Sequence, residues 1–244
     1  MDNKLYVIGI GPGDFEQMTL RAVKALESCD LIVGYGVYVE LVRPHFPEKE
    51  YYVTGMRGEV ERCRYALAKA REGKRTAVIC SGDAGVYGMA GLVYELRGEE
   101  ENPAIEVVSG LTAACSGAAV LGAPLTHDFA VISLSDLLTE WELIEKRLVC
   151  TAQSDLSIVL YNPASRKRHD YLQRACEILL RYVEPERVCG VARNIGREGE
   201  SFQVMTLKEL CDFQADMFVT VFIGNPQTRN IGGKMVTPRG YRNV

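Results

Sequence analysis

The sequence predicts an α/β protein of two domains, the first built on a mostly parallel sheet and the second on a mixed sheet. Short apolar runs of strand length alternate with longer segments in which apolar residues recur at helical spacing. Such alternation is typical of parallel sheets with helices on both faces. The length of 244 residues suits two domains of about 120 residues each, which we place at residues 1–122 and 123–244. We expect an active-site cleft between the domains or beyond the carboxyl ends of the strands.

The first half alternates short strands with amphipathic helices. Its first strand, over 4–10, is followed by a helix over 18–29 that begins near Thr19. A helix over 58–73 ends at Gly73, a residue that suits the left-handed position after a helix. The other elements predicted here are strands over 30–34, 75–83 and 104–110 and helices over 86–98 and 111–122.

The second half continues the alternation and then changes to strands. Segments 187–196 and 201–207 are separated by the short turn 197–200, which predicts an antiparallel pair and hence a mixed sheet. We expect the polar, glycine-rich tail 227–244 to become ordered only against a partner or a substrate. The other elements predicted here are strands over 129–135, 156–165 and 216–226 and helices over 140–152 and 170–183.

Composition and charge exclude several classes of protein. A hydrophobic share of 47% is ordinary for a globular protein, and a net charge of −4 leaves no basic footprint for nucleic acid. The longest uncharged stretch, 107–126, is interrupted by Gly, Ser, Thr and Pro, so we expect no membrane span, and the N-terminus lacks a signal-peptide pattern. The eight cysteines form no C-x-x-C motif, which predicts reduced, mostly buried thiols in a cytoplasmic protein and no protein-bound metal.

The turn after the first strand, GIGPGD at 9–14, follows the dinucleotide-binding pattern only in part. Gly9 and Gly11 fit G-x-G-x-x-G, but Asp14 stands where the third glycine belongs and would repel a pyrophosphate. Pro12 also removes a backbone N–H that could bind an anion. This turn favours a cationic or neutral ligand that carries a ribose, or else it is a strand-to-helix connection without a ligand.

Further turns of the same kind follow other strands, at 81–88, 109–114 and 161–165. The carboxyl ends of parallel strands meet at one edge of a sheet, so the turns of the first half should lie together. Glycine allows close approach of a ligand, and Asp83 or Thr112 could hydrogen-bond it. The alternative is that Asp83 caps a helix and the glycines only shape a tight connection.

Three stretches resemble the tetrapyrrole methylases, namely VIGIGPGDFEQMTLRAVKAL, SGDAGVYGMAGLV and SGLTAACSGAAVLGAPLTHDFAVISLSD. Members of this family are S-adenosylmethionine-dependent enzymes of corrin and sirohaem synthesis. The later stretches ISLSDLLTEWELIEKRL, VLYNPASRKR and GVARNIGREGE look like one branch, the precorrin-3B or cobalt-factor III C17-methyltransferases of cobalamin biosynthesis. The resemblance covers nearly the whole chain, in order.

The resemblance implies that S-adenosylmethionine binds folded between the two domains and is held largely by backbone groups. This ligand carries a sulfonium cation and no phosphate, so a turn with Asp14 and Pro12 is compatible with it. Matched motif by motif, the implied cofactor-binding residues are Gly11, Pro12, Gly13, Ser81, Gly82, Asp83, Val86, Thr112, Ala113, Tyr161, Asn162, Asn194 and Gly196.

Two residues depart from the family pattern. Ala84 and Ser109 stand where the family usually has proline. Because proline fixes φ, its loss should loosen both loops. We expect weaker preorganisation of the cofactor loops rather than loss of binding.

The resemblance also implies the reaction. A methyl group would be displaced in line from the sulfonium onto C17 of the macrocycle, coupled to ring contraction in which a substrate acetate closes a lactone. A proton donor or acceptor would be needed, and His127, Asp128 and Asp14 are candidates by position only; His127 also suits a hydrogen-bonding role in a turn. The candidates for binding substrate carboxylates are Arg57, Arg166, Lys167, Arg168 and Arg193.

Alternative functions stay open at this point. The chain could methylate another corrin position, or a different acceptor as the diphthine-forming relatives do. It could instead be a non-catalytic S-adenosylmethionine-binding regulator, whereas Asp14 argues against a dehydrogenase. The 165–168 cluster could also be a solvated surface. The resemblance implies a homodimer with a tetrapyrrole substrate, with cobalt, if any, inside the substrate, and with neither nucleic acid nor a membrane as partner.

Overall fold

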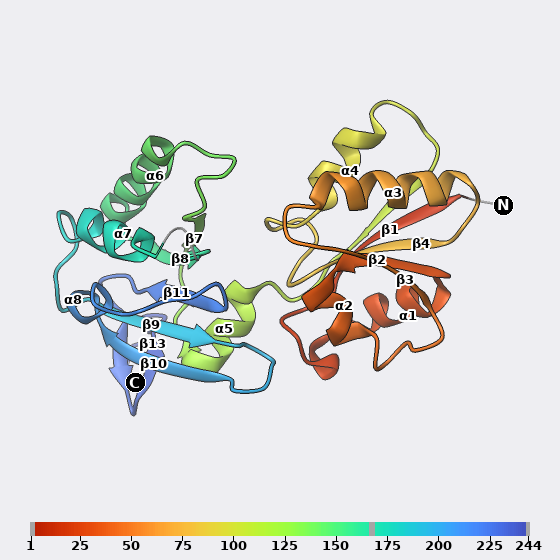
Figure 1. The fold of residues 1–244 in the computed structure, drawn as a ribbon. Coiled ribbons are helices and arrows are strands. Elements are labelled where there is room, and N and C mark those ends of the chain that lie inside the picture. The colour runs from red at the N-terminus through yellow and green to blue at the C-terminus, as the bar shows by residue number, and fades with distance from the viewer. Residues whose placement is uncertain (1–2, 166–168, 243–244) are drawn as a thin grey trace. The chain divides into compact units, whose positions relative to one another are not determined.

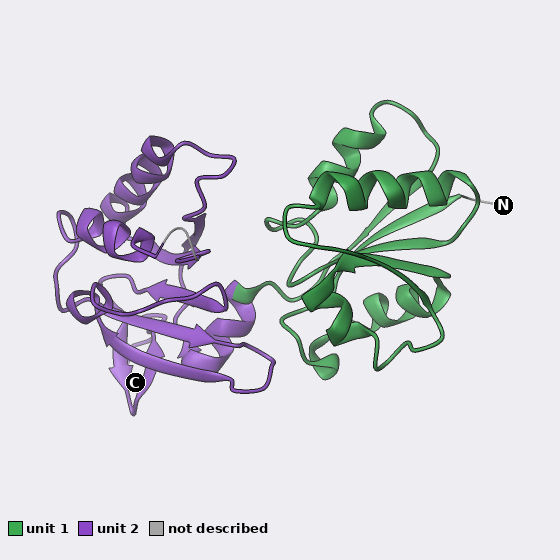
Figure 2. Ribbon diagram, in the orientation of Figure 1, with its two compact units in different colours: residues 1–113 green, residues 114–244 purple. Residues whose placement is uncertain are grey.

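The computed structural model describes residues 3–165 and 169–242 of the chain (Figure 1). The chain forms two compact units, residues 1–113 and 114–244 (Figure 2). The division falls after Ala113, the first residue of helix α5 (Ala113–Leu121), whereas the sequence-based boundary follows this helix. This helix packs on the second sheet, since a Cβ added at Gly117 would lie 2.9 Å from side-chain atoms of both Ile195 and Phe222. The sequence-based boundary between residues 122 and 123 stays a prediction for where independently folding domains would divide.

The first unit contains a five-stranded sheet of order β3-β2-β4-β1-β5 in which every pair is parallel. Helices α1 and α2 lie on one face of this sheet and α3 and α4 on the other (Figure 1). The strands are β1 (Lys4–Gly9), β2 (Leu31–Tyr35), β3 (Glu50–Thr54), β4 (Thr76–Cys80) and β5 (Ala104–Val108). The helices are α1 (Leu20–Ser28), α2 (Gly36–Val42), α3 (Glu59–Arg71) and α4 (Ala90–Arg97).

Alternation along the central strands fills a core on each face of this sheet. Ile8 and Ile32 pack with α1 and α2, whereas Val7 and Val33 pack with α3 and α4. Because both faces are covered, every residue of β4 is buried, as the unbroken apolar runs of the sequence predict. The prediction of a parallel sheet in the first half is confirmed.

The ends of the helices follow the sequence signals closely. The Thr19 side chain accepts a hydrogen bond from the N–H of Ala22 at the start of α1. Gly73 (φ +89°) and Gly98 (φ +68°) follow α3 and α4 in conformations that glycine tolerates. The sequence analysis did not foresee α2 and β3. Strand β3 is the edge strand of the sheet, and its half-exposed residues weaken the apolar signal.

The second unit contains a mixed sheet of order β10-β9-β11-β8-β7. Strands β7 and β8 are parallel, and the other neighbours are antiparallel, including the predicted pair β9–β10. Helices α6, α7 and α8 share one core with this sheet. The strands are β7 (Phe129–Ser133), β8 (Ser157–Tyr161), β9 (Val188–Arg193), β10 (Ser201–Thr206) and β11 (Val219–Ile223). The helices are α6 (Trp141–Gln153), α7 (Tyr171–Leu179) and α8 (Leu207–Leu210).

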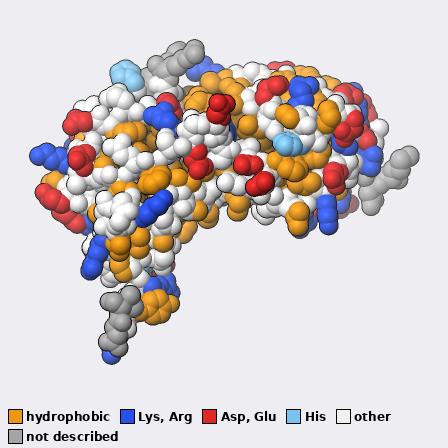
Figure 3. Space-filling view, turned by 90° about the horizontal axis from the view of Figure 1, so that it is seen from below, with side chains coloured by type: hydrophobic (Ala, Val, Ile, Leu, Met, Phe, Trp, Pro, Cys, Tyr) orange, Lys and Arg blue, Asp and Glu red, His pale blue; other side chains and the backbone are white. Residues whose placement is uncertain are grey.

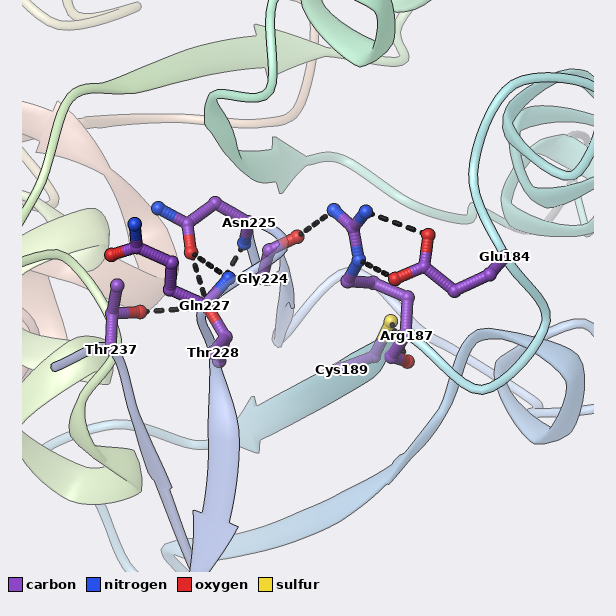
Figure 4. A network of polar contacts seen from close by, with 8 residues as sticks. All are labelled: Glu184, Arg187, Cys189, Gly224, Asn225, Gln227, Thr228 and Thr237. Atoms are coloured by element: carbon purple, nitrogen blue, oxygen red, sulfur yellow. Dashed lines mark hydrogen bonds and ion pairs between the residues drawn. The ribbon is translucent and has the colours of Figure 1, made fainter.

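Most of the C-terminal tail is part of this unit, so the expectation that it orders only against a partner is wrong for residues 227–238. Strands β12 (Arg229–Ile231) and β13 (Lys234–Val236) form a hairpin, and β13 pairs with β6 (Gly122–Ala123). The buried hydroxyls of Thr228 and Thr237 lie 2.7 Å apart (Figure 4). The Thr237 hydroxyl also donates to the Pro124 carbonyl.

A second part of this polar network holds the chain just before the hairpin. The buried Arg187 guanidinium donates to the Gly224 carbonyl at 3.0 Å and to both carboxylate oxygens of Glu184 (Figure 4). Asn225 accepts from the Thr228 hydroxyl at 3.2 Å through its side-chain oxygen. Hydrogen bonds of this kind satisfy polar groups that burial would otherwise penalise.

The surface and the cysteines carry few special features. Basic and acidic side chains are interspersed on the face seen in Figure 3, without a continuous basic band. Within the described residues, no helix is long and apolar enough to cross a membrane. All eight cysteines are free, and five of them are buried.

Candidate functional site

Three loops meet at the carboxyl edge of the first sheet, because they follow the adjacent strands β4, β1 and β5. The loops after β1 and β4 are joined by a two-bond bridge between Gly11 and Gly82. The Gly82 N–H donates to the Gly11 carbonyl at 2.7 Å, and the Gly11 N–H donates to the Gly82 carbonyl at 3.1 Å. The predicted gathering of these glycine turns is therefore confirmed by the topology.

The carboxylate of Asp83 ties the second loop to the third. Its Oδ1 accepts from the N–H of Gly85 at 2.7 Å and of Val86 at 3.2 Å. Its Oδ2 accepts from the N–H of Gly110 at 2.9 Å. Bonds to a carboxylate are stronger than those between neutral groups, so Asp83 organises both loops. The alternative that Asp83 caps a helix is not confirmed, because α4 (Ala90–Arg97) has Met89 as its N-cap and no side-chain cap bond. A carboxylate oxygen of Asp83 can still accept a further bond.

The glycines of this edge are required mainly by contact between the loops themselves. A Cβ added at Gly9 would lie 2.6 Å from the Gly82 carbonyl oxygen, and one at Gly110 would lie 2.2 Å from the same oxygen. A Cβ at Gly82 would make only ordinary contacts, the nearest at 3.6 Å from the Cα of Thr112, but the φ of +68° at this position favours glycine. The sequence analysis assigned such glycines to ligand approach, whereas Gly9 and Gly110 admit close approach of neighbouring backbone.

The first loop is closed by a short 3₁₀ helix, η1 (Phe15–Gln17). Asp14 caps this helix, because its Oδ1 accepts from the Glu16 N–H at 3.0 Å. The side-chain oxygen Oε1 of Gln17 is buried and has no hydrogen-bond partner among the described residues. A buried acceptor of this kind suits a donor brought by a ligand or a water molecule. The sequence analysis did not single out Gln17, since a lone glutamine carries no pattern.

The charge of these loops fits the methyl donor that the family resemblance implies. Segments 9–14, 81–88 and 109–114 contain two aspartates and no Lys or Arg. A pyrophosphate would meet carboxylates without a compensating cation, whereas a sulfonium cation meets a favourable field. The residues of these loops therefore fit an adenosine-bearing cation.

The thiol of Cys80, just before the second loop, takes no part in this chemistry. Burial raises the pKa of Cys80 to about 12, despite the hydrogen bond from the Met89 N–H to its sulfur. A thiol that stays protonated at neutral pH is not a nucleophile. Within the described residues, no cluster of His, Cys, Asp and Glu could hold a metal ion.

The predicted site residues of the second unit lie at one edge of its sheet. Strands β8 and β9 run in the same direction because both are antiparallel to β11, so Tyr161 and Asn194 stand at their carboxyl ends. The Tyr161 hydroxyl accepts from the Ala114 N–H at 2.6 Å. Asn162 (φ +54°) donates through its side chain to the Ser133 hydroxyl at 2.9 Å, and the Gly196 N–H donates to Glu200 at 2.7 Å.

His127 and Asp128 lie at the opposite edge of that sheet. They precede β7, which is parallel to β8, so five residues of strand separate them from the edge where Asn162 lies. At about 3.3 Å per residue, this separation exceeds the reach of either side chain. The His127 Nε2 lies 3.0 Å from the Pro238 carbonyl oxygen, which ties the C-terminal segment to this edge. These positions favour the hydrogen-bonding role for His127.

Of the predicted substrate-binding cations, Arg193 belongs to the second unit and Arg57 to the first. Arg193 forms an ion pair with Asp216 and also donates to the Gln214 carbonyl. Arg57 is exposed, follows β3 at the carboxyl edge of the first sheet, and has a φ of +67°. Arg166, Lys167 and Arg168 lie outside the described residues.

Comparison with known proteins assigns the family. Residues 4–211 match the family model of the tetrapyrrole (corrin/porphyrin) methylases. The chain belongs to this family. The solved structure of the methyltransferase CobJ matches it with a TM-score of 0.88 and 36% identity, over 96% of this chain and 99% of that chain. The two-unit fold is thus that of a tetrapyrrole methylase.

Three curated relatives show which members of the family this chain is similar to. A cobalt-factor III methyltransferase of Priestia megaterium is 44% identical over 99% of this chain and 46% of the relative. A probable cobalt-factor III C(17)-methyltransferase of Salmonella typhimurium is 44% identical over 97% of this chain and 99% of the relative. A precorrin-3B C(17)-methyltransferase of Sinorhizobium sp is 39% identical over 99% of this chain and 98% of the relative. The chain therefore spans about half of the first relative and nearly all of the other two.

Proposed function

We propose that this chain is an S-adenosylmethionine-dependent methyltransferase that acts at C17 of cobalt-factor III or precorrin-3B, with ring contraction, in cobalamin biosynthesis. The observation that carries the proposal is 44% identity across nearly the full length of both chains to a probable cobalt-factor III C(17)-methyltransferase. The similarity to CobJ over 96% of the chain supports the same conclusion. Cobalt, where present, is part of the substrate.

The cofactor-binding surface in this proposal is the carboxyl edge of the first sheet. The backbone groups of Gly11 to Gly13, Ser81 to Asp83 and Thr112 would hold the donor, with Val86 and Ala113 beside them. Residues Tyr161, Asn162, Asn194 and Gly196 would add contacts from the second unit. Asp83 supports this arrangement because it holds the second and third loops in a fixed register.

The donor, when bound, supplies an electrophilic methyl group on a sulfonium. The transfer would break the sulfur–methyl bond and form a bond from the methyl group to C17 with an electron pair of the macrocycle, so that the donor would leave as a neutral thioether. The main tasks of the chain are then alignment and exclusion of water. Asp14 and Asp83 would favour the cationic donor over its neutral product, which promotes turnover by easing product release.

The finer parts of the proposal concern substrate contacts and assembly. Arg57, Arg193 and the 166–168 cluster would contact carboxylates of the tetrapyrrole. We also propose a cytoplasmic homodimer, in keeping with the family resemblance. Light scattering on the purified chain would test the dimer.

Transfer of a labelled methyl group tests the activity. The full chain is mixed anaerobically with methyl-labelled S-adenosylmethionine and either cobalt-factor III or precorrin-3B, and label is followed into the macrocycle. We expect label in one of these two substrates and none in a reaction with S-adenosylhomocysteine added in excess. Tight donor binding without label in either macrocycle would contradict the proposal and favour a regulator or another acceptor.

A further inference from the structure

The connection between β3 and α3 is a tight turn with a cation at a strained position. The Gly58 N–H donates to the Gly55 carbonyl at 3.3 Å, so Met56 and Arg57 are its central residues. Arg57 has a φ of +67°, a value that normally requires glycine or asparagine at the second central position of such a turn. An arginine with this φ is a backbone outlier, and outliers of this kind cluster at sites that clamp ligands.

A second arginine, Arg62, holds this turn through hydrogen bonds. Arg62, on the second turn of α3, is 4% exposed. Its Nε donates to the Thr54 hydroxyl at 2.8 Å, and its Nη2 donates to the Gly55 carbonyl at 2.9 Å. The Gly55 carbonyl therefore accepts from both Gly58 and Arg62, which fixes the start of the turn.

The buried guanidinium of Arg62 is unusual because no carboxylate of the described residues pairs with its charge. Among the described residues, its guanidinium forms no ion pair. It contacts the Thr54 hydroxyl, the Gly55 carbonyl and the ring of Tyr35, whose centroid lies 5.9 Å away. A buried guanidinium without a carboxylate is costly, so a better-packed apolar residue would serve stability alone equally well. Arg62 instead holds the turn that presents Arg57.

The side chain of Arg57 is available for a ligand. It is exposed and, among the described residues, makes no hydrogen bond or ion pair. The neighbouring Met56 is 63% exposed, so this turn offers an apolar surface beside a cation. An arginine fork binds a carboxylate through two parallel hydrogen bonds, and an exposed methionine adapts to a flat apolar body.

We propose that Arg57 binds a carboxylate of the macrocyclic substrate and that Arg62 is the positioning residue that holds its turn in the strained conformation. This inference rests on the proposed function, because it assigns a substrate contact at the sheet edge where the methyl donor is proposed to bind. It deepens that function in two respects: it gives the exposed Arg57 a defined ligand group, whereas Arg193 is already paired with Asp216, and it gives the buried Arg62 a role.

The first test separates binding from stability. In Arg57→Gly the cation is lost while the φ of the turn suits the new residue, so the melting temperature should stay unchanged or rise. The dissociation constant for cobalt-factor III, measured from its visible absorption without methyl donor, should rise about tenfold or more, the scale of one charge-assisted pair. The matched control is Arg64→Ala, which removes one exposed charge from the solvent side of α3. We expect it to bind the macrocycle within twofold of the wild type.

The second test asks whether Arg62 acts through Arg57. Arg62→Met should weaken macrocycle binding in the wild-type background but cause no further loss in the Arg57→Gly background. A purely structural role would give equal losses in both backgrounds. Arg57→Lys, which keeps the charge without the fork, should fall between the wild type and Arg57→Gly.

The outcomes separate this inference from the proposed function. Wild-type affinity in Arg57→Gly, or equal losses for Arg57→Gly and Arg64→Ala, would overturn the inference while leaving methyl transfer intact. A chain that binds the macrocycle through Arg57 but transfers no methyl group would overturn the proposed function and leave the inference standing. A wild-type chain that binds neither cobalt-factor III nor precorrin-3B would overturn both.

Discussion

The carboxylate of Asp83 accepts a hydrogen bond from the backbone N–H of Gly110 at 2.9 Å, and this bond joins the loop after β4 to the loop after β5. The same carboxylate accepts from Gly85 and Val86 within its own loop. A single side chain thus sets the spacing of two of the three loops at the proposed donor site.

Replacement of Asp83 should therefore affect structure and donor binding together. In Asp83→Asn, the neutral amide cannot accept three N–H bonds as strongly, and we expect a loss of about 1–3 kcal/mol and donor affinity weakened about tenfold. Isothermal titration with S-adenosylmethionine and amide hydrogen exchange of residues 81–88 measure the two effects. Asp14→Asn is the matched control, because asparagine also caps a helix. Equal weakening in both variants would show that charge, rather than the tie between loops, governs affinity.

The close approach of the loops predicts opposite effects for two glycine substitutions. In Gly110→Ala the new methyl group would lie 2.2 Å from the Gly82 carbonyl oxygen, so backbone must move at a cost on the order of 3 kcal/mol. Gly91, in α4, has no atom within 4 Å of its Cβ position, and Gly91→Ala should stabilise by about 0.5–1 kcal/mol. Thermal melting of both variants checks the contrast. A neutral Gly110→Ala would contradict the packing described for these loops.

Restoration of a family proline should tighten the third loop. Ser109 follows β5, and the extended backbone of Val108 is the conformation that a following proline prefers. We expect Ser109→Pro to stabilise by about 0.4–1 kcal/mol, because it restricts the unfolded chain, and to improve donor affinity. Melting temperature and titration with S-adenosylmethionine test this. A destabilised variant with weaker donor binding would mean that the loop needs the conformational freedom of serine.

The pair formed by Glu184 and Arg187 predicts a pH-dependent stability. The hydrogen bonds from Arg187 hold the pKa of Glu184 below its ordinary value of 4.5. A carboxylate with a depressed folded-state pKa stabilises at neutral pH, and this contribution is lost as the pH falls below 4.5.

Glu184→Gln tests that contribution. We expect a loss of about 1 kcal/mol at pH 7, a modest value because the Glu184 side chain is 52% exposed and its charge is screened. The difference from the wild type should shrink as the pH falls below the ordinary glutamate pKa. Urea unfolding at several pH values measures it. A difference that is constant from pH 7 down to pH 3.5 would exclude the ion pair as its cause.

Much of the fold follows from local sequence signals. Strands such as β4 are built mainly of apolar residues, and helix ends carry their capping residues, as at Thr19 and Gly98. Strand β3 and the C-terminal hairpin escaped prediction because their order depends on partners distant in sequence. Strand β3 pairs with β2 at a half-exposed edge, and the hairpin depends on buried hydroxyls such as those of Thr228 and Thr237.

The candidate site, like the fold, has features that the sequence predicts and features that it does not. The glycine motifs predict which loops gather, because topology follows from strand order. They do not predict that Gly9 and Gly110 serve contact between loops, since that depends on distances of a few ångströms. Arg62 and Gln17 also escaped prediction, because a buried guanidinium in α3 and an orphaned amide oxygen are visible only in three dimensions.

The most direct measurement of the central claim is the position of the transferred methyl group. The chain is incubated anaerobically with ¹³C-methyl S-adenosylmethionine and whichever macrocycle accepts label, and the product is examined by mass spectrometry and ¹³C NMR. The account predicts one added methyl group, located on C17, in a contracted ring. A single methyl group on any other carbon of an uncontracted macrocycle would contradict it, although the chain would still act as a tetrapyrrole methylase.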